Sequence, residues 1–344
     1  MNLSRLNHKA SRGGVIINSD GSMNPPITQI KQTGNTYTLT DDLKIHIQFF
    51  LQKSDIVFDG GGHVIGDGRV GNIVVGPYGG VSNVTIKNFY MDQTATNDID
   101  VTNSSNIIIK NNTLLGGGDI FGQTNGVALT NCQSVTIIGN VIKGTMCGID
   151  LLNSSYNVIA GNVIDAKTSW TWNHYPEALM IDVRYVEGGE TSGGSSNNLI
   201  YDNAFMSSGN LTNIFGSSSN RWDNGQIGNY WGDYSTKYPG VVEVDNSGIG
   251  NTPYVIDPNN VDHYPLMSQG SLVFPVPISS VPTSTPTTTP TISSITSTPS
   301  AVTSTPTVPE FTSTIILALL GTVTFAIAIK YRRIKNRNSN GKAR

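Results

Sequence analysis

The sequence predicts an all-β protein built as a parallel β-helix, and three observations carry that prediction. A short motif of the form I-x-x-N recurs along the middle of the chain. A second strand-like stretch, such as "GVALTNCQ" or "GIDLLNSS", precedes copies of that motif. The composition holds 37 glycines and only 13% charged residues among 344, which favours short strands and tight turns over helices.

The spacing of the motif defines the repeat. The motif ends in degenerate form at Gly61 ("FDGG") and Phe89 ("IKNF"), and then in full copies at Asn112, Asn140, Asn162 and Asn203. The successive spacings are 28, 23, 28, 22 and 41 residues. Periods of this size mark a solenoid, in which each unit buries its core only by stacking on its neighbours. Leucine-rich repeats are the alternative, but their fixed leucines are missing and no helical pattern separates the strands.

Each repeat unit has the alternation of short strands. In "SSYNVIAGNVIDA", from Ser154 to Ala166, apolar side chains occupy every second or third position, and we expect Val158 and Val163 to face the interior. Asparagine at a matching turn in successive coils predicts a ladder, in which each amide bonds to the coils above and below it. Asparagine also tolerates the left-handed backbone of tight turns. We therefore interpret the asparagines as structural.

The organisation along the chain follows from these repeats and from shifts in composition. An aromatic-rich cap is expected after the coils, because the end of a β-helix exposes an unpaired strand edge that would otherwise aggregate. The predicted segments are an N-terminal segment and cap (1–50), β-helix repeats (51–215), the C-terminal cap (216–270), a disordered Thr/Ser/Pro stalk (271–310), one transmembrane helix (311–329) and a basic cytoplasmic tail (330–344).

The C-terminal quarter predicts where the protein resides. Residues 274–309 are rich in Thr, Ser and Pro and lack any acidic or basic residue, so they cannot bury enough apolar surface to fold. The 17 uncharged residues "STIILALLGTVTFAIAI" match the length of about 17–25 that spans a bilayer. The basic "KYRRIKNR" that follows favours the cytoplasmic side. Everything before the span is then expected outside. The N-terminal residues show no apolar export signal, so either the true start lies upstream of Met1, which we favour, or the C-terminal span directs export alone.

Two resemblances refine these expectations. The arrangement of "VPEF" (308–311), apolar span and basic tail resembles the PEF-type C-terminal sorting signals of archaeal surface proteins. This resemblance implies a sorting protease of the archaeosortase type as a partner, with the span replaced by another anchor such as a lipid.

The repeats over residues 37–215 resemble NosD-like and pectin-lyase-like proteins, which implies a right-handed β-helix. The segments "DGSMNPPITQIKQTGNTYTLTDD" (20–42), "NRWDNGQIGNYWGDY" (220–234) and "SGIGNTPYVIDPNNVDHYPLM" (247–267) look like parts of archaeal NosD-like surface proteins. The resemblance indicates fold and location well, and activity poorly, since such folds host many functions.

An outward column of aspartates is the candidate catalytic site. Aligning the first strands puts Asp100, Ala128, Asp150 and Asp182 in one column, and the alternation of "GIDL" directs Asp150 outward. We expect Asp150 and Asp182 on adjacent coils about 4.8 Å apart, and Asp100 about 9.6 Å from Asp150. Carboxylates about 5–5.5 Å apart suit a retaining glycosidase, and about 6.5–9.5 Å an inverting one. An ordinary solvated face, or one that holds a cation, would show the same column.

The longest spacing predicts a long loop beside this column, between Lys167 and Ser196. Aromatic rings pack against the C–H faces of sugars. The candidate carbohydrate-binding residues in the loop are Trp170, Trp172, Tyr175, Arg184 and Tyr185. The same aromatic residues would equally serve to cover a hydrophobic edge, so both interpretations stay open.

We predict no cofactor. NosD itself is associated with maturing a copper enzyme, and copper handling needs clustered His, Met or Cys. Here the potential donors are scattered, at His8, His46, His63, His174, His263, Cys132 and Cys147. Cys132 falls where neighbouring repeats have Ser, which indicates a small buried side chain. Calcium at Asp245 or Asp257 is the one metal left open, although no twelve-residue calcium loop is present.

Two hypotheses of function follow. The first is a membrane-anchored cell-surface protein with a structural, adhesive or carbohydrate-binding role, whose partners are polysaccharides or cell-envelope glycans. The second is a polysaccharide hydrolase or lyase that uses the outward carboxylates, although the "DD" beside "GHG" of polygalacturonases is absent. Residues 1–329 contain 14 basic and 24 acidic residues, a net charge of −10. That acidity argues against nucleic acid as a partner, because phosphate binding needs a basic face.

Overall fold

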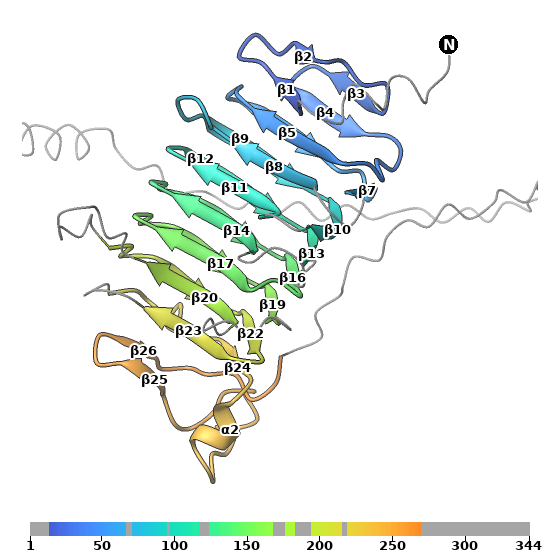
Figure 1. Ribbon diagram of the computed structural model, residues 1–344. Coiled ribbons are helices and arrows are strands. Elements are labelled where there is room, and N and C mark those ends of the chain that lie inside the picture. Colours follow the sequence, from blue (N-terminus) through green and yellow to red (C-terminus); the bar gives the residue numbers. More distant parts are fainter. Residues whose placement is uncertain are drawn as a thin grey trace, which may run out of the picture. The chain divides into compact units, whose positions relative to one another are not determined.

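The described part of the chain is a right-handed β-solenoid of about six turns (Figure 1), which confirms the predicted fold. The computed structural model describes residues 14–66, 71–94, 97–116, 124–167, 176–182, 194–214 and 219–269. The predicted stalk, transmembrane helix and basic tail lie outside these residues. Within the described ranges, no helix is both long enough and apolar enough to cross a membrane.

Three sheets run along the solenoid, and successive coils pair in parallel within each of them. The first sheet contains β1 (Val15–Ile17), β5 (Ile47–Leu51), β8 (Gly71–Val75), β11 (Ile99–Thr102), β14 (Asn125–Thr130), β17 (Cys147–Leu152), β20 (Glu177–Asp182) and β23 (Asn210–Ile214), with β2 (Met23–Asn24) antiparallel at its edge. The second contains β3 (Ile30–Thr33), β4 (Thr36–Leu39), β6 (Ile56–Asp59), β9 (Ser82–Lys87), β12 (Ser105–Lys110), β15 (Thr136–Ile138), β18 (Val158–Ala160) and β21 (Leu199–Tyr201). The third contains β7 (Val64–Ile65), β10 (Tyr90–Thr94), β13 (Thr113–Gly116), β16 (Val141–Lys143), β19 (Val163–Ala166), β22 (Ala204–Ser207) and β24 (Tyr230–Trp231).

The interior is filled by rows of apolar side chains, one from each coil. The row of the third sheet is fully buried and consists of Ile65, Met91, Leu114, Ile142, Ile164 and Phe205. The second sheet has an equivalent row, formed by Phe58, Ile86, Ile109, Ile137, Ile159 and Ile200. Burying each aliphatic side chain contributes about 1.5–3 kcal/mol, so stacking of coils is the main source of stability.

The prediction for the two valines is half right. Val163 is buried, with 2% of its surface exposed. Val158 is only half-buried, because Ile159 pairs with Ile137 and takes the inward position. With a period of two, neighbouring positions on one strand face opposite sides, so Ile159 fills the core position and Val158 does not. Val163 is buried although its neighbour Ile164 holds the inward position of that strand.

The predicted asparagine ladder is confirmed at the corner between the second and third sheets. The Nδ2 of each asparagine donates to the Oδ1 of the next at 2.9–3.0 Å, in the order Asn112, Asn140, Asn162, Asn203 and Asn229. The side chains are buried, and each Oδ1 also accepts a backbone N–H, as when Asn140 donates to Asn162 at 2.9 Å. Buried amides are costly unless bonded, and here each finds partners on two coils.

A second buried ladder runs along the corner between the first and second sheets. The Nδ2 of Asn157 donates to Oδ1 of Asn198 at 3.0 Å, and that of Asn198 to Oδ1 of Asn220 at 2.9 Å. A row of small residues accompanies it, in the order Ser104, Cys132, Ser154 and Ser195, linked in part by bonds such as Cys132 N to Ser154 Oγ at 3.0 Å. The buried Cys132 stands in a serine position, as predicted.

Left-handed backbone is supplied by neighbours of the ladder asparagines rather than by those asparagines themselves. The residue just before each full copy's last position has a positive φ: 54° at Asn111, 65° at Gly139, 62° at Gly161 and 56° at Asp202. Asn, Asp and Gly adopt this region most readily. The third and fourth positions of the I-x-x-N motif therefore have separate roles, one in turning the chain and one in bonding between coils.

The C-terminal cap closes the open end of the core with aromatic rings. Trp222 and Trp231 are buried, and the ring of Tyr254 stacks on Trp231 with centroids 4.1 Å apart. The cap contains the short helix α2 (Tyr234–Lys237) and the antiparallel hairpin of β25 (Tyr254–Asp257) and β26 (Asn260–Asp262). Both ladders reach β26: Asn220 N donates to Oδ1 of Asn260 at 3.0 Å, and Asn229 N to Oδ2 of Asp262 at 2.7 Å.

Candidate functional site

β11 and β17 belong to the first sheet (Figure 1). They carry the predicted carboxylates at outward positions. Asp100 pairs with Ala128, and Ala128 pairs with Asp150. The two aspartates are half-buried and alternate with buried core residues on their strands. They are two strand spacings apart, about 9.6 Å at the backbone. The predicted relation of these three positions is therefore confirmed.

The predicted place of Asp182 is wrong. Met180 is the neighbour of Asp150 across the strand pair, and Asp182 pairs with Leu152. The alignment matched the "ID" of "GIDL" with the "ID" of "MIDV", whereas the buried Leu179 is the partner of Ile149. A shift of two residues preserves the apolar alternation, which is why the sequence pattern did not expose the error. Asp100 and Asp150 remain as the carboxylates of the column.

Asparagines that the sequence analysis missed hold these carboxylates. Asn97 Nδ2 donates to Oδ1 of Asp100 at 2.7 Å, and Asn125 Nδ2 reaches Oδ2 of Asp150 at 3.4 Å. The Oδ1 of Asn97 accepts the backbone N–H of Asn125 at 2.9 Å, so the two pairs are continuous. The equal separation of 28 residues between Asn97 and Asn125 and between Asp100 and Ala128 was the signal that could have revealed them.

The row continues onto the next two strands of the first sheet. Asn213 on β23 donates through Nδ2 to Oε1 of Glu177 on β20 at 2.7 Å. We call the six residues together the polar strip; its members are Asn97, Asp100, Asn125, Asp150, Glu177 and Asn213. Ala128 lies between Asp100 and Asp150 on the paired strands and carries only a methyl group, which is buried.

Burial raises the pKa of two groups, one in the strip and one beside it. Desolvation raises the pKa of Asp100 above its ordinary value, against the opposing effect of the Asn97 amide. Burial also raises the pKa of the Cys147 thiol, and the charges of Asp150 and Glu177 add to that rise. Cys147 therefore stays a protonated thiol and is not a nucleophile.

The candidate carbohydrate-binding residues of the long loop lie outside the residues that the structure describes. The nearest residues that the structure describes are 176–182. Before them in the sequence come Trp170, Trp172 and Tyr175, and after them come Arg184 and Tyr185. Their place relative to the strip therefore stays a prediction.

The two calcium candidates differ in their surroundings. Asp257 uses both carboxylate oxygens within the hairpin: Oδ1 accepts from the backbone N–H of Asn259 at 2.7 Å and Oδ2 from Nδ2 of Asn260 at 2.8 Å. Asp245 is exposed in a turn with a φ of 48°. In the part of the chain that the structure covers, no three residues among His, Cys, Asp and Glu come together as a metal site.

The donors that the structure describes do not fit a copper centre either. His63 and His263 each contact one carboxylate, Asp42 at 3.3 Å and Asp223 at 3.0 Å, on different coils. Both cysteines are buried and donate to backbone carbonyls, Cys147 to Ile149 at 3.2 Å. Copper needs imidazole, thioether or thiolate ligands brought together, and these are apart. His8 and His174 lie outside the described residues.

Comparison with known proteins found two solved structures and one protein family that this chain resembles. Two solved structures of the periplasmic alginate epimerase AlgG, one of them a point mutant, are similar to it at 11% and 13% sequence identity, each with a TM-score of 0.31. Each alignment covers 53% of this chain and 49% or 48% of the epimerase chain, so the match spans about half the length of either epimerase chain. No curated protein matches. The model of the NosD family, described as periplasmic copper-binding proteins, matches residues 13–236, and the chain, with its coils and ladders over that range, belongs to the NosD family.

Proposed function

We propose that this NosD-family protein works outside the cytoplasm, anchored through residues 311–329, and binds glycans along the outward face of the first sheet. The observation that carries the proposal is the polar strip, in which amides and carboxylates are held in fixed positions on adjacent coils. The extracytoplasmic location is supported by the family's description as periplasmic and by the Thr/Ser/Pro segment, apolar span and basic tail of the sequence.

The chemistry of the strip suits a hydroxylated polymer. Carboxylates accept hydrogen bonds from hydroxyl groups, and side-chain amides both accept hydrogen bonds from them and donate to them. Adjacent coils present such groups about every 4.8 Å along the sheet, which matches a ligand that is itself extended and periodic.

The charge of the strip selects among glycans. Asp100 contributes a carboxylate that is bonded to the uncharged amide of Asn97. An acidic polysaccharide would meet like charge at this carboxylate, so neutral glycans are the expected ligands.

A hydrolase is the second candidate, and one specific observation favours it. Burial raises the pKa of Asp100, as a general acid requires. Its partner Asp150 is two strand spacings away, about 9.6 Å at the backbone, near the upper end of the separation of about 6.5–9.5 Å found in inverting glycosidases.

The test is a panel of neutral and acidic polysaccharides applied to the full-length protein in mild detergent, scored for retention and for new reducing ends. Retention of a neutral polysaccharide, weakened about tenfold (1.4 kcal/mol) in Ala128→Leu, supports binding at the strip beside Ala128. Thr136→Leu is the matched control, because it places the same side chain on the outward face of the second sheet. Equal retention by both variants, or none by the native protein, would remove the strip as the binding face. Reducing ends that vanish in Asp150→Asn would establish the hydrolase instead.

A further inference from the structure

A cavity of about 530 Å³ lies where the last coil meets the C-terminal cap. Its walls come from β22, β23, β24, α2 and β25 (Figure 1). The polar residues and rings that matter for its chemistry are Asn210, Thr212, Tyr230, Asp233, Lys237 and Tyr254. The polar strip contributes none of the residues around this cavity, so it is a separate place on the molecule.

The composition of one interior row changes at this cavity. In the first sheet, Val127, Ile149 and Leu179 stack in register and are fully buried. The next position in register is Thr212, which is half-buried and lines the cavity. If this row served only to close the core, an aliphatic residue would stand at its last position, because hydroxyl groups are costly to bury without partners. The threonine therefore indicates an interior surface that meets a polar occupant.

Asp233 gives the cavity an oriented carboxylate. Its Oδ2 accepts a hydrogen bond from the hydroxyl of Tyr254 at 3.2 Å. Its Oδ1 is buried, and no donor in the described part of the chain reaches it. Burial raises the pKa of Tyr254, and the charge of Asp233 raises it further, so the phenol stays a donor. An unbonded buried carboxylate oxygen is unfavourable, and a hydroxyl on a ligand would supply the missing donor.

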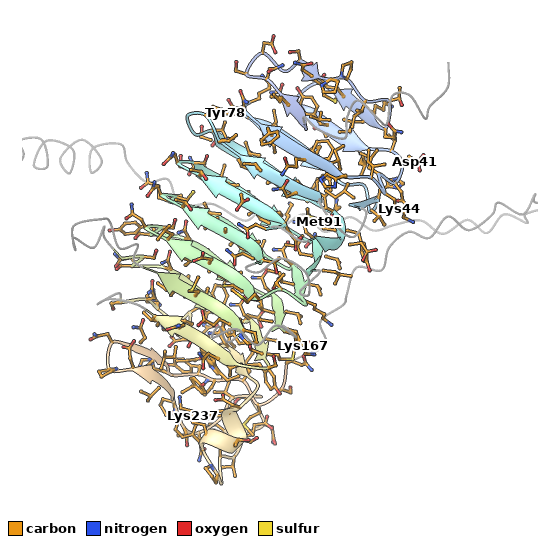
Figure 2. The ribbon with its side chains drawn as sticks, in the orientation of Figure 1. Asp41, Lys44, Tyr78, Met91, Lys167 and Lys237 are labelled. Carbon is orange, nitrogen blue, oxygen red and sulfur yellow. The ribbon has the colours of Figure 1, made fainter. Side chains whose placement is uncertain are left out.

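Two side chains, Lys237 and Trp231, fix the ring of Tyr254, whose hydroxyl donates to this carboxylate. The Nζ of Lys237 lies 3.9 Å from the ring centroid of Tyr254 and donates to the carbonyl of Val255 at 2.6 Å; Figure 2 labels this lysine at α2. Trp231 stacks on the same ring with an interplanar angle of 2°. One ammonium and one carboxylate line the cavity, so its lining has no net charge.

We infer that this cavity is a second glycan site, which holds a single uncharged sugar residue or the end of a neutral glycan chain. Its volume falls in the range of about 300–1,000 Å³ typical of small-molecule sites. A sugar brings several hydroxyl groups to Asp233, Thr212 and Asn210, and an apolar C–H face to the half-exposed ring of Tyr230. A charged ligand would be unmatched in a lining of balanced charge. That the ligand is a glycan rests on the proposed function, whereas the identification of the residues that line the cavity does not depend on it.

The experiment uses the full-length protein and ligand-observed saturation-transfer NMR. The probes are cellobiose, maltose, lactose, mannobiose and chitobiose, with digalacturonate as the anionic counterpart. Asp233→Asn keeps the shape and removes the charge, and Thr212→Val keeps the volume and removes the hydroxyl. Asp245→Asn makes the same chemical change as Asp233→Asn at an exposed turn of the cap outside the cavity. Asp100→Asn changes the strip alone.

Transfer to at least one neutral disaccharide, weakened about tenfold in Asp233→Asn and in Thr212→Val, is the expected result. The Asp245→Asn variant should keep the native signal. Loss in Asp100→Asn alone would assign the disaccharide to the strip and overturn the cavity site, while leaving the proposed function in place. No transfer to any neutral disaccharide, or a preference for digalacturonate, would also overturn it. Unfolding of Asp233→Asn would show in the amide spectrum, and Thr212→Val then decides.

Discussion

The backbone N–H of Asn229 donates to the Oδ2 of Asp262 at 2.7 Å, and the indole Nε1 of Trp231 donates to the same oxygen at 2.9 Å. Through this contact, a buried carboxylate on the cap hairpin completes the asparagine ladder of the coils. Asp262 is itself fully buried. The stability of the cap and that of the coils are therefore coupled, which leads to the first two predictions.

Stability should fall as pH rises through the range in which Asp262 ionises. Burial raises the pKa of Asp262 from 3.8 to about 6. Between these values the native state holds a proton that the unfolded state has released, so the free energy of unfolding decreases from about pH 4 to about pH 6 and then levels off, by at most about 3 kcal/mol from this group. Urea denaturation at pH 4 to 7 measures it. Asp262→Asn preserves an acceptor and should lose this part of the slope; an equal slope in both proteins would refute the assignment.

Gly228→Ala should unfold the cap. A Cβ at this position would run into the carboxylate of Asp262, which cannot move without losing its bonds to Asn229 and Trp231. The expected loss is at least about 3 kcal/mol, the scale of a broken buried network. Tryptophan fluorescence of Trp222 and Trp231 reports it. Gly225→Ala is the contrasting variant, because nothing lies within 4 Å of its added Cβ and its cost is limited to the strain of a φ of 90°.

Asn162→Ala should be far more damaging than Asn153→Ala. Asn162 is buried and donates to Asn203, Ile137 and Ala160. Its removal leaves partners on both sides unsatisfied and should cost about 3 kcal/mol or more. Asn153 is exposed and donates to Oδ1 of Asn131 at 2.7 Å. Its replacement should cost about 1–2 kcal/mol, which includes the strain of an alanine at a φ of 48°. Denaturant midpoints of the two variants compare them directly, and similar values would mean that the buried ladder adds no stability.

Both cysteines should resist alkylation in the native protein. Burial raises the pKa of Cys132 and of Cys147 and removes them from solvent, and only the thiolate reacts. Mass spectrometry after iodoacetamide at pH 8 should find neither labelled, and both labelled after unfolding in urea. Rapid native labelling of Cys147 would show that the strip around it is open.

Deleting residues 311–344 should release the protein from membranes. The apolar span 311–329 is the predicted anchor, so cell fractionation should move the truncated protein to the soluble fraction while the full chain stays in the membrane pellet after alkaline extraction. A truncated protein that remains in the pellet would point to a different anchor.

The fold could be predicted from the sequence because its main determinants are local and periodic. The I-x-x-N motif places a turn and a ladder residue together, and the spacing from Asn112 to Asn162 fixes the coils between them. The site was predicted less well. Asp100 and Asp150 followed from the repeat, but the register of Asp182 depended on which apolar residues meet across the segment between β17 and β20, and alternation alone does not determine that.

The partners of the carboxylates were missed for a related reason. Asn97 and Asn125 lie at the starts of coil segments, among many asparagines of similar appearance, and only their contacts distinguish them from turn residues. The end cavity left even less trace in the sequence, because it is formed by residues from Met206 to Ile256 that approach each other only when the cap folds.

The ladder has a direction, and this bears on how such a protein can lengthen during evolution. From Asn112 to Asn203, the side-chain to side-chain bonds all run one way: each Nδ2 donates to the Oδ1 of the next asparagine toward the C-terminal end. The series ends where Asn229 meets the carboxylate of Asp262. An asparagine rung accepts from one neighbour and donates to the next, so one coil can be duplicated between two others without leaving a group unbonded. The carboxylate only accepts. New coils can therefore enter the middle of the stack, while the last position is a fixed terminus.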